Sequence, residues 1–519
     1  MKSTFALRRS QHAHRVSRLS GLLCLVLCCL AHVRLGAAIW YLDQAAAGAN
    51  NGTSPADAWN SVASVEMKAI QSGDTLLIQG GDYSTEELSL VPAAHRTNIA
   101  FRINPTATRK AVFRSISLYG AHHCTIDGLL PGTDNHHYST SIQMFKTVGL
   151  NTVHAGLRTL HANSVLIRES DGATVRGVEC DQSALKAYVD DGGMQQHGVA
   201  VNGSVYNLTV EYNYVHDTIG DGLNYIYSRQ NPTSFTNIIT RYNYVYRVGD
   251  DCLQGGGNQD IYGNLLDQGG VPIYYGAHPD AIQINPFCSY VKIHENVMAD
   301  TGQQPFLENV EGEIYVYNNI ILCLRSGALA TSPGQSHAAV ITSADGRSGN
   351  GYTGPSYGNL IFANNLIFNC TSFLAINGGW PSNANNHVIL TGNVFINCKY
   401  GAPKEAQYFC ESSSVWWDLP HTVWYAFHGE ETSAPSPRYF GTALHKNPGL
   451  VDPDGLNFHP AAATSLVVGL SRNLTEYGIN TDFDGNPRPA TGNWTAGPYE
   501  WHGVSANDGL PLVPDSRKH

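Results

Sequence analysis

The sequence predicts an all-β fold in which short strands stack into a solenoid. Glycine accounts for 52 of the 519 residues, 10% are aromatic and only 14% are charged, a mix that favours turn-rich β structure over a helical bundle. A loose repeat of about 22–30 residues runs through the middle of the chain. Since no segment shows a sustained helical period, each unit has to close its core by stacking on its neighbours.

The repeat is visible in four segments of the same design. Each has a β-branched strand, a turn that contains asparagine, a second short strand, a polar turn and a third strand. The segments are "NLTVEYNYVHDTIGDGLNYIY", "NIITRYNYVYRVGDDCLQGGG", "YVKIHENVMADTGQQPFLENV" and "NLIFANNLIFNCTSFLAINGG". Asparagine at a repeated corner suits left-handed turns and ladders of side-chain amide hydrogen bonds, which we expect here.

The N-terminus has the pattern of a secretory signal peptide. A basic stretch is followed by "LSGLLCLVLCCLAHV" and by small residues near Ala37 and Ala38, and the apolar run is shorter than the roughly 20 residues of a membrane-spanning helix. We therefore expect residues 1–38 to be removed and the protein to be secreted. The remaining cysteines are even in number, which permits full disulfide pairing without fixing the pairs: Cys124, Cys180, Cys252, Cys288, Cys323, Cys370, Cys398 and Cys410.

Charge and motif content narrow the class of partner. The formal net charge of −11 argues against nucleic acid, because phosphate binding needs a basic face. It leaves room for an anionic substrate that is held through bound cations. Six N-x-S/T sequons suit a glycoprotein: Asn51, Asn202, Asn207, Asn369, Asn473 and Asn493. Cysteine and histidine spacing typical of zinc sites is absent from the sequence, no later run is apolar enough to span a bilayer, and a monomer is expected.

The two ends of the mature chain carry a family resemblance. The chain opens with "IWYLDQAAAGANNGTSPADAWNSVASV" and "IQSGDTLLIQGGDYS" and closes with "NPGLVDPDGLNFHP" and "TDFDGNPRPATGNWTAGPYEW". With the repeats, these segments resemble the right-handed parallel β-helix proteins of the pectin-lyase-like superfamily. The resemblance implies a single-stranded right-handed parallel β-helix over residues 39–500 and a tail over 501–519. That superfamily holds polysaccharide lyases, glycoside hydrolases, uronan epimerases and non-catalytic surface proteins, so the fold does not decide the chemistry.

One region departs from the repeat. Residues 401–446 are rich in aromatic residues, and we expect them to form an irregular insertion. Trp416, Trp417 and Trp424 lie within it and are candidates either for stacking on sugar rings or for packing against the side of the solenoid.

Acidic residues recur at one corner when the repeats are aligned on their last strands. "GDGLN", "GDDCLQ" and "HPDAIQ" place Asp221, Asp251 and Asp280 there, with Asp250 alongside and His197 one rung earlier. Neighbouring rungs are about 4.8 Å apart, so the three aspartates are expected within roughly 10 Å of one another. Three residues further on, a second column of candidate substrate-binding residues follows: Asn224, Gln254, Gln283 and Glu308.

Stacked carboxylates repel one another by about 3 kcal/mol per neighbouring pair. Three arrangements relieve this repulsion. Ca²⁺ binds, since it takes six to eight oxygen ligands; one carboxyl keeps a proton and becomes a general acid; or the aspartates accept hydrogen bonds from backbone N–H groups of the turns.

The first catalytic hypothesis is β-elimination at a uronate. The aspartates are similar to those of pectate lyases, whose Ca²⁺ is held on neighbouring coils, which implies that Asp221, Asp251 and Asp280 hold the metal. Those enzymes carry a lysine base where this chain has Gln283. The base is then expected to be Tyr275 or His278, and Arg247 is a candidate for neutralising the substrate carboxylate, with a surface ion pair as its other interpretation.

Three other hypotheses stay open. "DGLN" and "GDDCLQ" resemble polygalacturonase motifs, which implies hydrolysis by Asp221, Asp250 and Asp251. Tyr275-Gly-Ala-His278-Pro-Asp280 resembles the Tyr-Gly-Phe-Asp-Pro-His of mannuronan C5-epimerases with two positions exchanged. In a non-catalytic glycan-binding protein, the aspartates only form turns. The leading expectation is a secreted enzyme that cleaves an acidic polysaccharide by Ca²⁺-assisted elimination.

Overall fold

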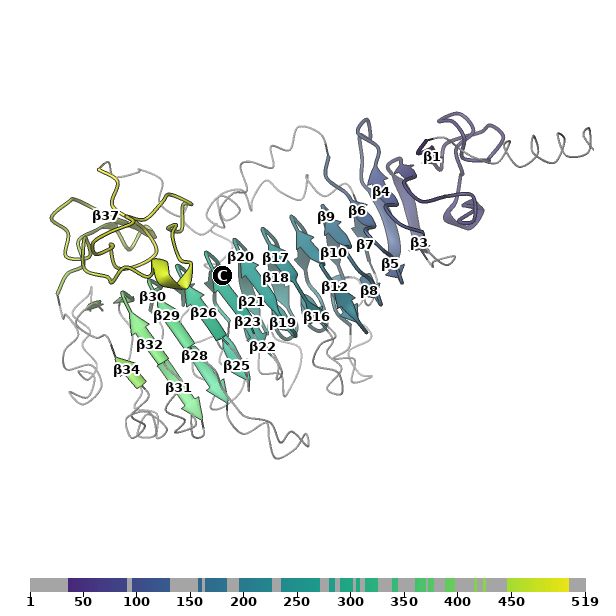
Figure 1. Cartoon of the computed structure of the whole chain (residues 1–519). Coiled ribbons are helices and arrows are strands. Elements are labelled where there is room, and N and C mark those ends of the chain that lie inside the picture. The colour runs from purple at the N-terminus through teal and green to yellow at the C-terminus, as the bar shows by residue number, and fades with distance from the viewer. Residues whose placement is uncertain are drawn as a thin grey trace, which may run out of the picture.

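The chain forms a parallel β-helix, which confirms the predicted fold class (Figure 1). The computed structural model describes residues 36–90, 96–130, 157–160, 164–183, 196–225, 235–270, 280–284, 290–301, 305–308, 313–324, 338–343, 360–369, 372–377, 388–396, 415–417, 423–425 and 446–503. A typical coil gives one strand to each of three faces, as β13, β14 and β15 do, and the same face of the next coil pairs with it in parallel. The predicted signal peptide lies almost wholly outside the described residues.

The first face is a single 13-stranded parallel sheet. Its strands are, in order, β1 (Ile39–Leu42), β2 (Thr75–Ile78), β4 (Ala100–Ile103), β6 (Thr125–Asp127), β9 (Thr174–Arg176), β13 (Thr209–Glu211), β17 (Ile238–Arg241), β20 (Gln259–Tyr262), β23 (Tyr290–His294), β26 (Glu313–Tyr317), β29 (Leu360–Ala363), β32 (Val388–Thr391) and β34 (Val415–Trp417).

The other two faces begin together in the long strands β3 (Gly81–Leu90) and β5 (Ala111–Tyr119), which pair with each other. Further along the stack, β5 pairs with the next strand of each of the two faces. The second face continues through β7 (Leu157–Thr159), β10 (Val178–Asp181), β14 (Tyr214–His216), β18 (Tyr244–Val248), β21 (Leu265–Gly269), β24 (Val297–Ala299), β27 (Ile320–Leu322), β30 (Leu366–Phe368), β33 (Val394–Ile396) and β35 (Val423–Tyr425). The third runs through β8 (Val165–Arg168), β11 (Val199–Asn202), β15 (Leu223–Tyr225), β19 (Leu253–Gly255), β22 (Ile282–Ile284), β25 (Phe306–Glu308), β28 (Ala338–Ser343) and β31 (Ser372–Asn377). A short parallel pair, β12 (Val205–Tyr206) and β16 (Phe235–Thr236), joins two coils.

The core of the helix consists of columns of inward-facing side chains. Because successive strands are in register, one column on the second face reads Val215, Val245, Leu266, Met298 and Ile321 along consecutive coils, all of them fully buried. Alternation along each strand sends every second residue outward. Burying these columns is the main source of the fold's stability.

A ladder of buried asparagines marks the corner between the first and second faces, as the repeat predicts. The backbone N–H and side-chain amide of each member donate to the Oδ1 atom of the next, at 2.9–3.1 Å. The members are Asn213, Asn243, Asn264, Asn296, Asn319, Asn365 and Asn393, separated by 30, 21, 32, 23, 46 and 28 residues. The predicted period therefore holds approximately, and loop insertions lengthen single coils.

The left-handed turn lies one residue before each ladder asparagine, not at the asparagine itself. Positive φ angles of 53–63° occur at Tyr212, Tyr242, Gly263, Glu295, Asn318, Asn364 and Gly392. The corner residue thereby turns the chain and points away from the core, while the following asparagine points inward and satisfies the backbone groups of the bend.

Residues 446–503 do not continue the helix, although the helix was predicted to extend to residue 500. They hold the antiparallel pair β36 (Leu450–Asp452) and β37 (Asn457–Pro460), and they fold back over the flank near one end of the stack (Figure 1). Phe458, Val467 and Tyr499 pack against the outward side chains of β24 to β33. This segment, the C-terminal clamp, therefore covers an apolar stripe that the solenoid leaves on its outside.

The clamp also grips the left-handed corners through polar contacts. The buried guanidinium of Arg488 donates to Asn318 Oδ1 at 2.9 Å and pairs with Glu500 at 3.1 Å. Ser471 Oγ donates to Asn364 Oδ1 at 2.6 Å, and Gly497 N–H donates to the carbonyl of Gly392 at 2.7 Å. Side chains that leave the helix at its corners thus form the attachment points of the clamp.

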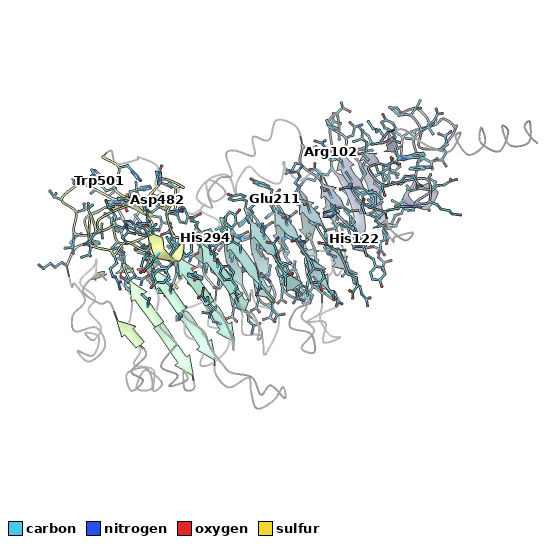
Figure 2. All side chains as sticks on the ribbon, viewed as in Figure 1. Arg102, His122, Glu211, His294, Asp482 and Trp501 are labelled. Carbon is cyan, nitrogen blue, oxygen red and sulfur yellow. The ribbon has the colours of Figure 1, made fainter. Side chains whose placement is uncertain are left out.

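His294 lies beside this junction and gives the stability of the fold a pH dependence. Figure 2 shows His294 on the stack next to the segment that carries Asp482. Its Nε2 atom is 2.9 Å from Asp260 Oδ1 and its Nδ1 atom is 3.5 Å from Glu295 Oε2. Burial on its own lowers the pKa of His294, but the carboxylates of Glu295 and Asp260 outweigh it and raise the pKa to about 9.

We therefore expect the free energy of unfolding to fall as pH rises from 7 to 10. A histidine whose pKa is raised on folding stabilises the fold fully below its unfolded value, near 6.5, and this contribution disappears above about 9. The shift corresponds to about 3 kcal/mol. Urea unfolding of the wild type and of His294→Gln across this pH range measures this contribution, because the variant lacks the imidazole that titrates. Equal pH slopes for the two proteins would contradict the assignment.

Two other predictions concern residues 401–446 and the cysteines. The stretch 401–446 was expected to be irregular, yet β34 and β35 within it pair in parallel with β32 and β33 and add to the stack.

Cys124, Cys180 and Cys252 are buried free thiols, so they form no disulfide, while Cys288, Cys370, Cys398 and Cys410 lie outside the described residues. The turns η1 (Val62–Ser64) and η6 (Thr475–Tyr477) are short 3-10 helices, and no helix in the described ranges is long and apolar enough to cross a membrane.

Candidate functional site

The three predicted aspartates stack on successive coils at the entry to the third face. The N–H of Asp251 donates to Asp221 Oδ1 at 3.1 Å, and the N–H of Asp280 donates to Asp251 Oδ1 at 2.8 Å. His197 begins the column, since its Nδ1 atom lies 3.2 Å from Asp221 Oδ2. The predicted alignment is confirmed, and one oxygen of Asp221 and of Asp251 is used as a backbone acceptor in the way that turn-forming aspartates are.

A ladder of amides follows the aspartates three residues later. Asn224, Gln254 and Gln283 face one another in register on β15, β19 and β22. Asn224 Nδ2 donates to Gln254 Oε1 at 2.8 Å, and Gln254 Nε2 donates to Gln283 Oε1 at 2.6 Å. The predicted fourth member is wrong, because Gln283 pairs with Phe306 and not with Glu308.

The aspartates are buried more deeply than residues of an open groove. Asp251 and Asp280 are fully buried, and Asp221 is 3% exposed. Burial, together with the negative charges of Asp280, Asp250 and Asp221, raises the pKa of Asp251 well above its usual range. This site therefore favours either a protonated Asp251 or a bound cation that neutralises the carboxylates.

The close carboxylate cluster differs in one member from the predicted metal site. One oxygen each of Asp221, Asp250 and Asp251 lie within 4.8 Å of one another. Asp250 therefore takes the place that the sequence analysis gave to Asp280. The chain neighbours Asp250 and Asp251 both approach Asp221, whereas Asp280 lies on the coil after that of Asp251.

The cluster suits a hard cation such as Ca²⁺. Asp251 Oδ2 and Asn224 Oδ1 are buried and have no hydrogen-bond partner in the described part of the chain. Buried oxygens without partners are costly unless a ligand satisfies them. A donor set made only of carboxylate and amide oxygens matches the preference of Ca²⁺. Asn224 was predicted as a substrate contact, and its spacing of three residues from Asp221 is the signal that identifies it as a further oxygen donor.

The other predicted residues have different positions. Tyr275 and His278 lie outside the described residues, so their roles remain predictions. Arg247 forms an ion pair with Asp217, whose Oδ1 atom is 3.3 Å from the Arg247 Nε atom, in agreement with the alternative interpretation of this residue. Lys292, which was not a predicted site residue, lies on β23 of the first face, opposite Asp260 and Tyr315.

The spacing of the carboxylates can be compared with that of inverting glycosidases. Inverting glycosidases hold their two carboxyl groups about 6.5–9.5 Å apart so that a water fits between them. Here the nearest oxygens of Asp221, Asp250 and Asp251 are within 4.8 Å. At this separation, one oxygen from each of the three residues can contact the same ion.

Comparison with known proteins gives structural neighbours only. No family model and no curated protein sequence matches the chain. Among solved structures, XylC in complex with xylose has a TM-score of 0.46 at 10% identity and covers 90% of this chain and 99% of its own. The GH136 lacto-N-biosidase from Eubacterium ramulus has a TM-score of 0.41 at 13% identity, covering 70% and 67%. Pectate lyase Pel9A has a TM-score of 0.38 at 12% identity, covering 90% and 97%. At such identities the likeness concerns the β-helix fold, and the chemistry has to be argued from the residues of this chain.

Proposed function

We propose that this chain is a secreted carbohydrate-active enzyme that cleaves a uronic-acid-containing polysaccharide by Ca²⁺-assisted β-elimination. The observation that carries the proposal is the buried cluster of Asp221, Asp250 and Asp251, whose oxygens lie within 4.8 Å of one another next to unsatisfied oxygens of Asp251 and Asn224. A bound cation neutralises such a cluster, and a uronate substrate needs the same positive charge to neutralise its own carboxylate.

The chain's own residues fix the site before substrate arrives. The N–H of Asp280 holds Asp251 Oδ1, which orients the other oxygen of Asp251 for a ligand. The amide ladder from Asn224 to Gln283 holds the third face rigid beside the aspartates. When bound, Ca²⁺ neutralises the uronate carboxylate and acidifies the neighbouring C5 proton. Tyr275 and His278 precede Asp280 in the chain and are the proposed bases for that proton.

The test is an assay of purified protein on pectate, alginate and related uronans, with Ca²⁺ or with a chelator. We expect the ultraviolet absorbance of an unsaturated uronate product, present with Ca²⁺ and abolished by chelation. Tyr275→Phe and His278→Gln are expected to separate catalysis from binding, because whichever residue is the base loses turnover and keeps Ca²⁺ affinity. Lys292→Met, on the first face, is the matched control and should leave turnover unchanged.

Other outcomes would overturn the proposal in distinguishable ways. New reducing ends without the absorbance would identify a hydrolase. A changed ratio of uronate epimers without chain cleavage would identify an epimerase. Binding of the polysaccharide without any product would support a non-catalytic glycan-binding protein.

A further inference from the structure

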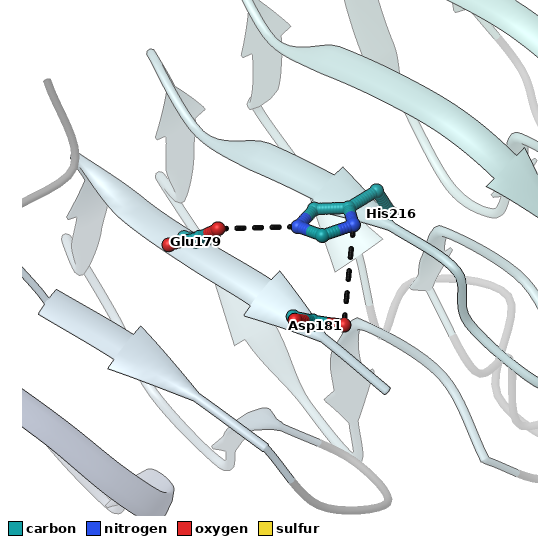
Figure 3. Close-up of side chains that lie close together, drawn as sticks. All are labelled: Glu179, Asp181 and His216. Carbon is teal, nitrogen blue, oxygen red and sulfur yellow. Dashed lines mark hydrogen bonds and ion pairs between the residues drawn. The ribbon is translucent and has the colours of Figure 1, made fainter. Parts of the chain in front are cut away.

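A second cluster of titratable side chains lies on the side of the second face that points away from the core. Glu179 and Asp181 project from β10, and His216 on β14 stands directly opposite Asp181 in register (Figure 3). The exposed fractions are 3%, 4% and 9%, respectively. One donor atom from each residue lies within 4.8 Å of the others. Regular strands position all three residues, so their geometry is set by the fold.

The imidazole of His216 is surrounded by carboxylate oxygens on both edges. Its Nδ1 atom lies 3.0 Å from Asp217 Oδ2 and 4.0 Å from Asp181 Oδ1. Its Nε2 atom lies 3.2 Å from Glu179 Oε1. A neutral imidazole carries one N–H. When Nδ1–H donates to Asp217, the lone pair of Nε2 faces Glu179 Oε1 at 3.2 Å, and either a second ring proton or a metal ion between the two atoms stabilises this contact.

The distance between these two atoms has the size expected for ligands of one metal ion. Zinc bonds to imidazole nitrogen and carboxylate oxygen measure about 2.0–2.1 Å, which places two ligands of a tetrahedral site about 3.3 Å apart. The observed Nε2–Oε1 distance is 3.2 Å. The Asp217 carboxylate on Nδ1 is the partner that commonly orients a metal-binding histidine through its other nitrogen.

Two cations of the described part of the chain contact the carboxylates around His216 through oxygens that do not face the ring. Lys110 Nζ contacts Oε2 of Glu179 and leaves Oε1 facing the imidazole. Arg247 pairs with Asp217 Oδ1 and leaves Oδ2 for the Nδ1 atom of His216. Glu179 and Asp217 are thereby each held through one oxygen and present the other to the ring. Asp181 Oδ1 accepts the Ser183 N–H at 2.8 Å and lies 4.0 Å from the His216 Nδ1 atom.

We propose that Glu179, Asp181 and His216 bind one first-row transition-metal dication such as Zn²⁺. Imidazole with two carboxylates suits zinc and its neighbours in the series, whereas Ca²⁺ prefers an all-oxygen shell. Three protein ligands leave a coordination position for water or for a substrate oxygen, as in catalytic zinc sites. The ligands come from distant parts of the chain, which is why metal-ligand spacing gives no signal in the sequence. The proposal is independent of the Ca²⁺ cluster and of the proposed lyase activity.

The test is metal binding by the full-length protein after removal of metals with a chelator. At mildly alkaline pH, where fewer protons compete, we expect one equivalent of Zn²⁺ by isothermal titration calorimetry and a cobalt ligand-field spectrum when Co²⁺ replaces it. His216→Gln should abolish both signals, and Asp217→Asn should weaken binding about 10–100-fold. Far-UV circular dichroism and thermal melting verify that the variants are folded.

Two controls make the result specific. His294→Gln is matched, because His294 also lies between carboxylates, and it should bind metal as the wild type does. Asp251→Asn removes a ligand of the Ca²⁺ cluster and should keep the cobalt spectrum. No binding by the folded wild type would show that a proton alone fills the position and would overturn the proposal, as would an unchanged spectrum in His216→Gln.

Discussion

Replacing Asp251 with asparagine is expected to reduce Ca²⁺-dependent cleavage of a uronan by at least roughly 10³-fold, about 4 kcal/mol in the activation free energy. The substitution keeps the size of the side chain, and an asparagine Oδ1 still accepts the Asp280 N–H that Asp251 accepts at 2.8 Å. It removes one charge of the cluster formed with Asp221 and Asp250. Steady-state rates over a Ca²⁺ titration measure the loss, and excess Ca²⁺ should restore only part of it.

The same substitution is expected to raise stability when Ca²⁺ is absent. Burial and three neighbouring carboxylates raise the pKa of Asp251, so the unliganded fold is strained by this group. Asparagine removes the strain, and we expect the melting temperature of the chelated variant to exceed that of the chelated wild type, while the increase caused by Ca²⁺ disappears. Asp82→Asn, at an exposed aspartate, is the control. A variant that still melts higher with Ca²⁺ would place the ion elsewhere.

Replacing Asn264 with alanine is expected to cost about 3–5 kcal/mol of unfolding free energy. Asn264 Oδ1 accepts both the N–H and the side-chain amide of Asn243, each at 3.0 Å. Its own amide donates to the carbonyls of Thr240 and Tyr262 and to Asn296 Oδ1. Alanine leaves several of these buried groups without partners, and water cannot reach them.

An exposed asparagine ladder provides the control for this experiment. Asn237 Nδ2 donates to Asn207 Oδ1 at 2.7 Å, but the two side chains are exposed, so water replaces the lost contact. Asn237→Ala is expected to cost less than about 1 kcal/mol. Chemical denaturation of both variants compares them directly. Equal losses would mean that the buried ladder adds nothing beyond an ordinary surface hydrogen bond.

Repetition explains which parts of the fold and site were predictable. The strand–turn pattern recurs with little variation, so it predicts the parallel stack and the asparagine ladder. Asp221, Asp251 and Asp280 share a constant offset of three residues to an amide in "GDGLN", "GDDCLQ" and "HPDAIQ". Because the offset stays constant, the alignment from one coil to the next holds in three dimensions.

Prediction from the sequence failed where the coil geometry changes or where a contact between coils lies outside the repeat pattern. "QPFLE" lacks the acidic corner residue, and the actual register shifts by two residues, so that Phe306 and not Glu308 meets Gln283. The partnership of Glu179 and Asp181 with His216 joins residues about 35 positions apart through a loop of arbitrary length, and no local pattern encodes it. "DFDGNPRP" marks the end of the fold, but the docking of Arg488 onto Asn318 depends on a register that one sequence does not reveal.

The C-terminal clamp imposes an order on biosynthesis. The outward column of Leu265, Val297, Ile320, Leu366 and Val394 packs against the clamp, which includes Phe458 and Tyr499. The ribosome synthesises the coils before the clamp. The apolar stripe therefore lacks its contacts with the clamp until residues 446–503 have been synthesised. Exposed apolar surface of this kind makes incompletely folded chains prone to aggregation. The clamp therefore completes the packing of this stripe only after the coils have been synthesised, and truncation before residue 446 is expected to cause aggregation.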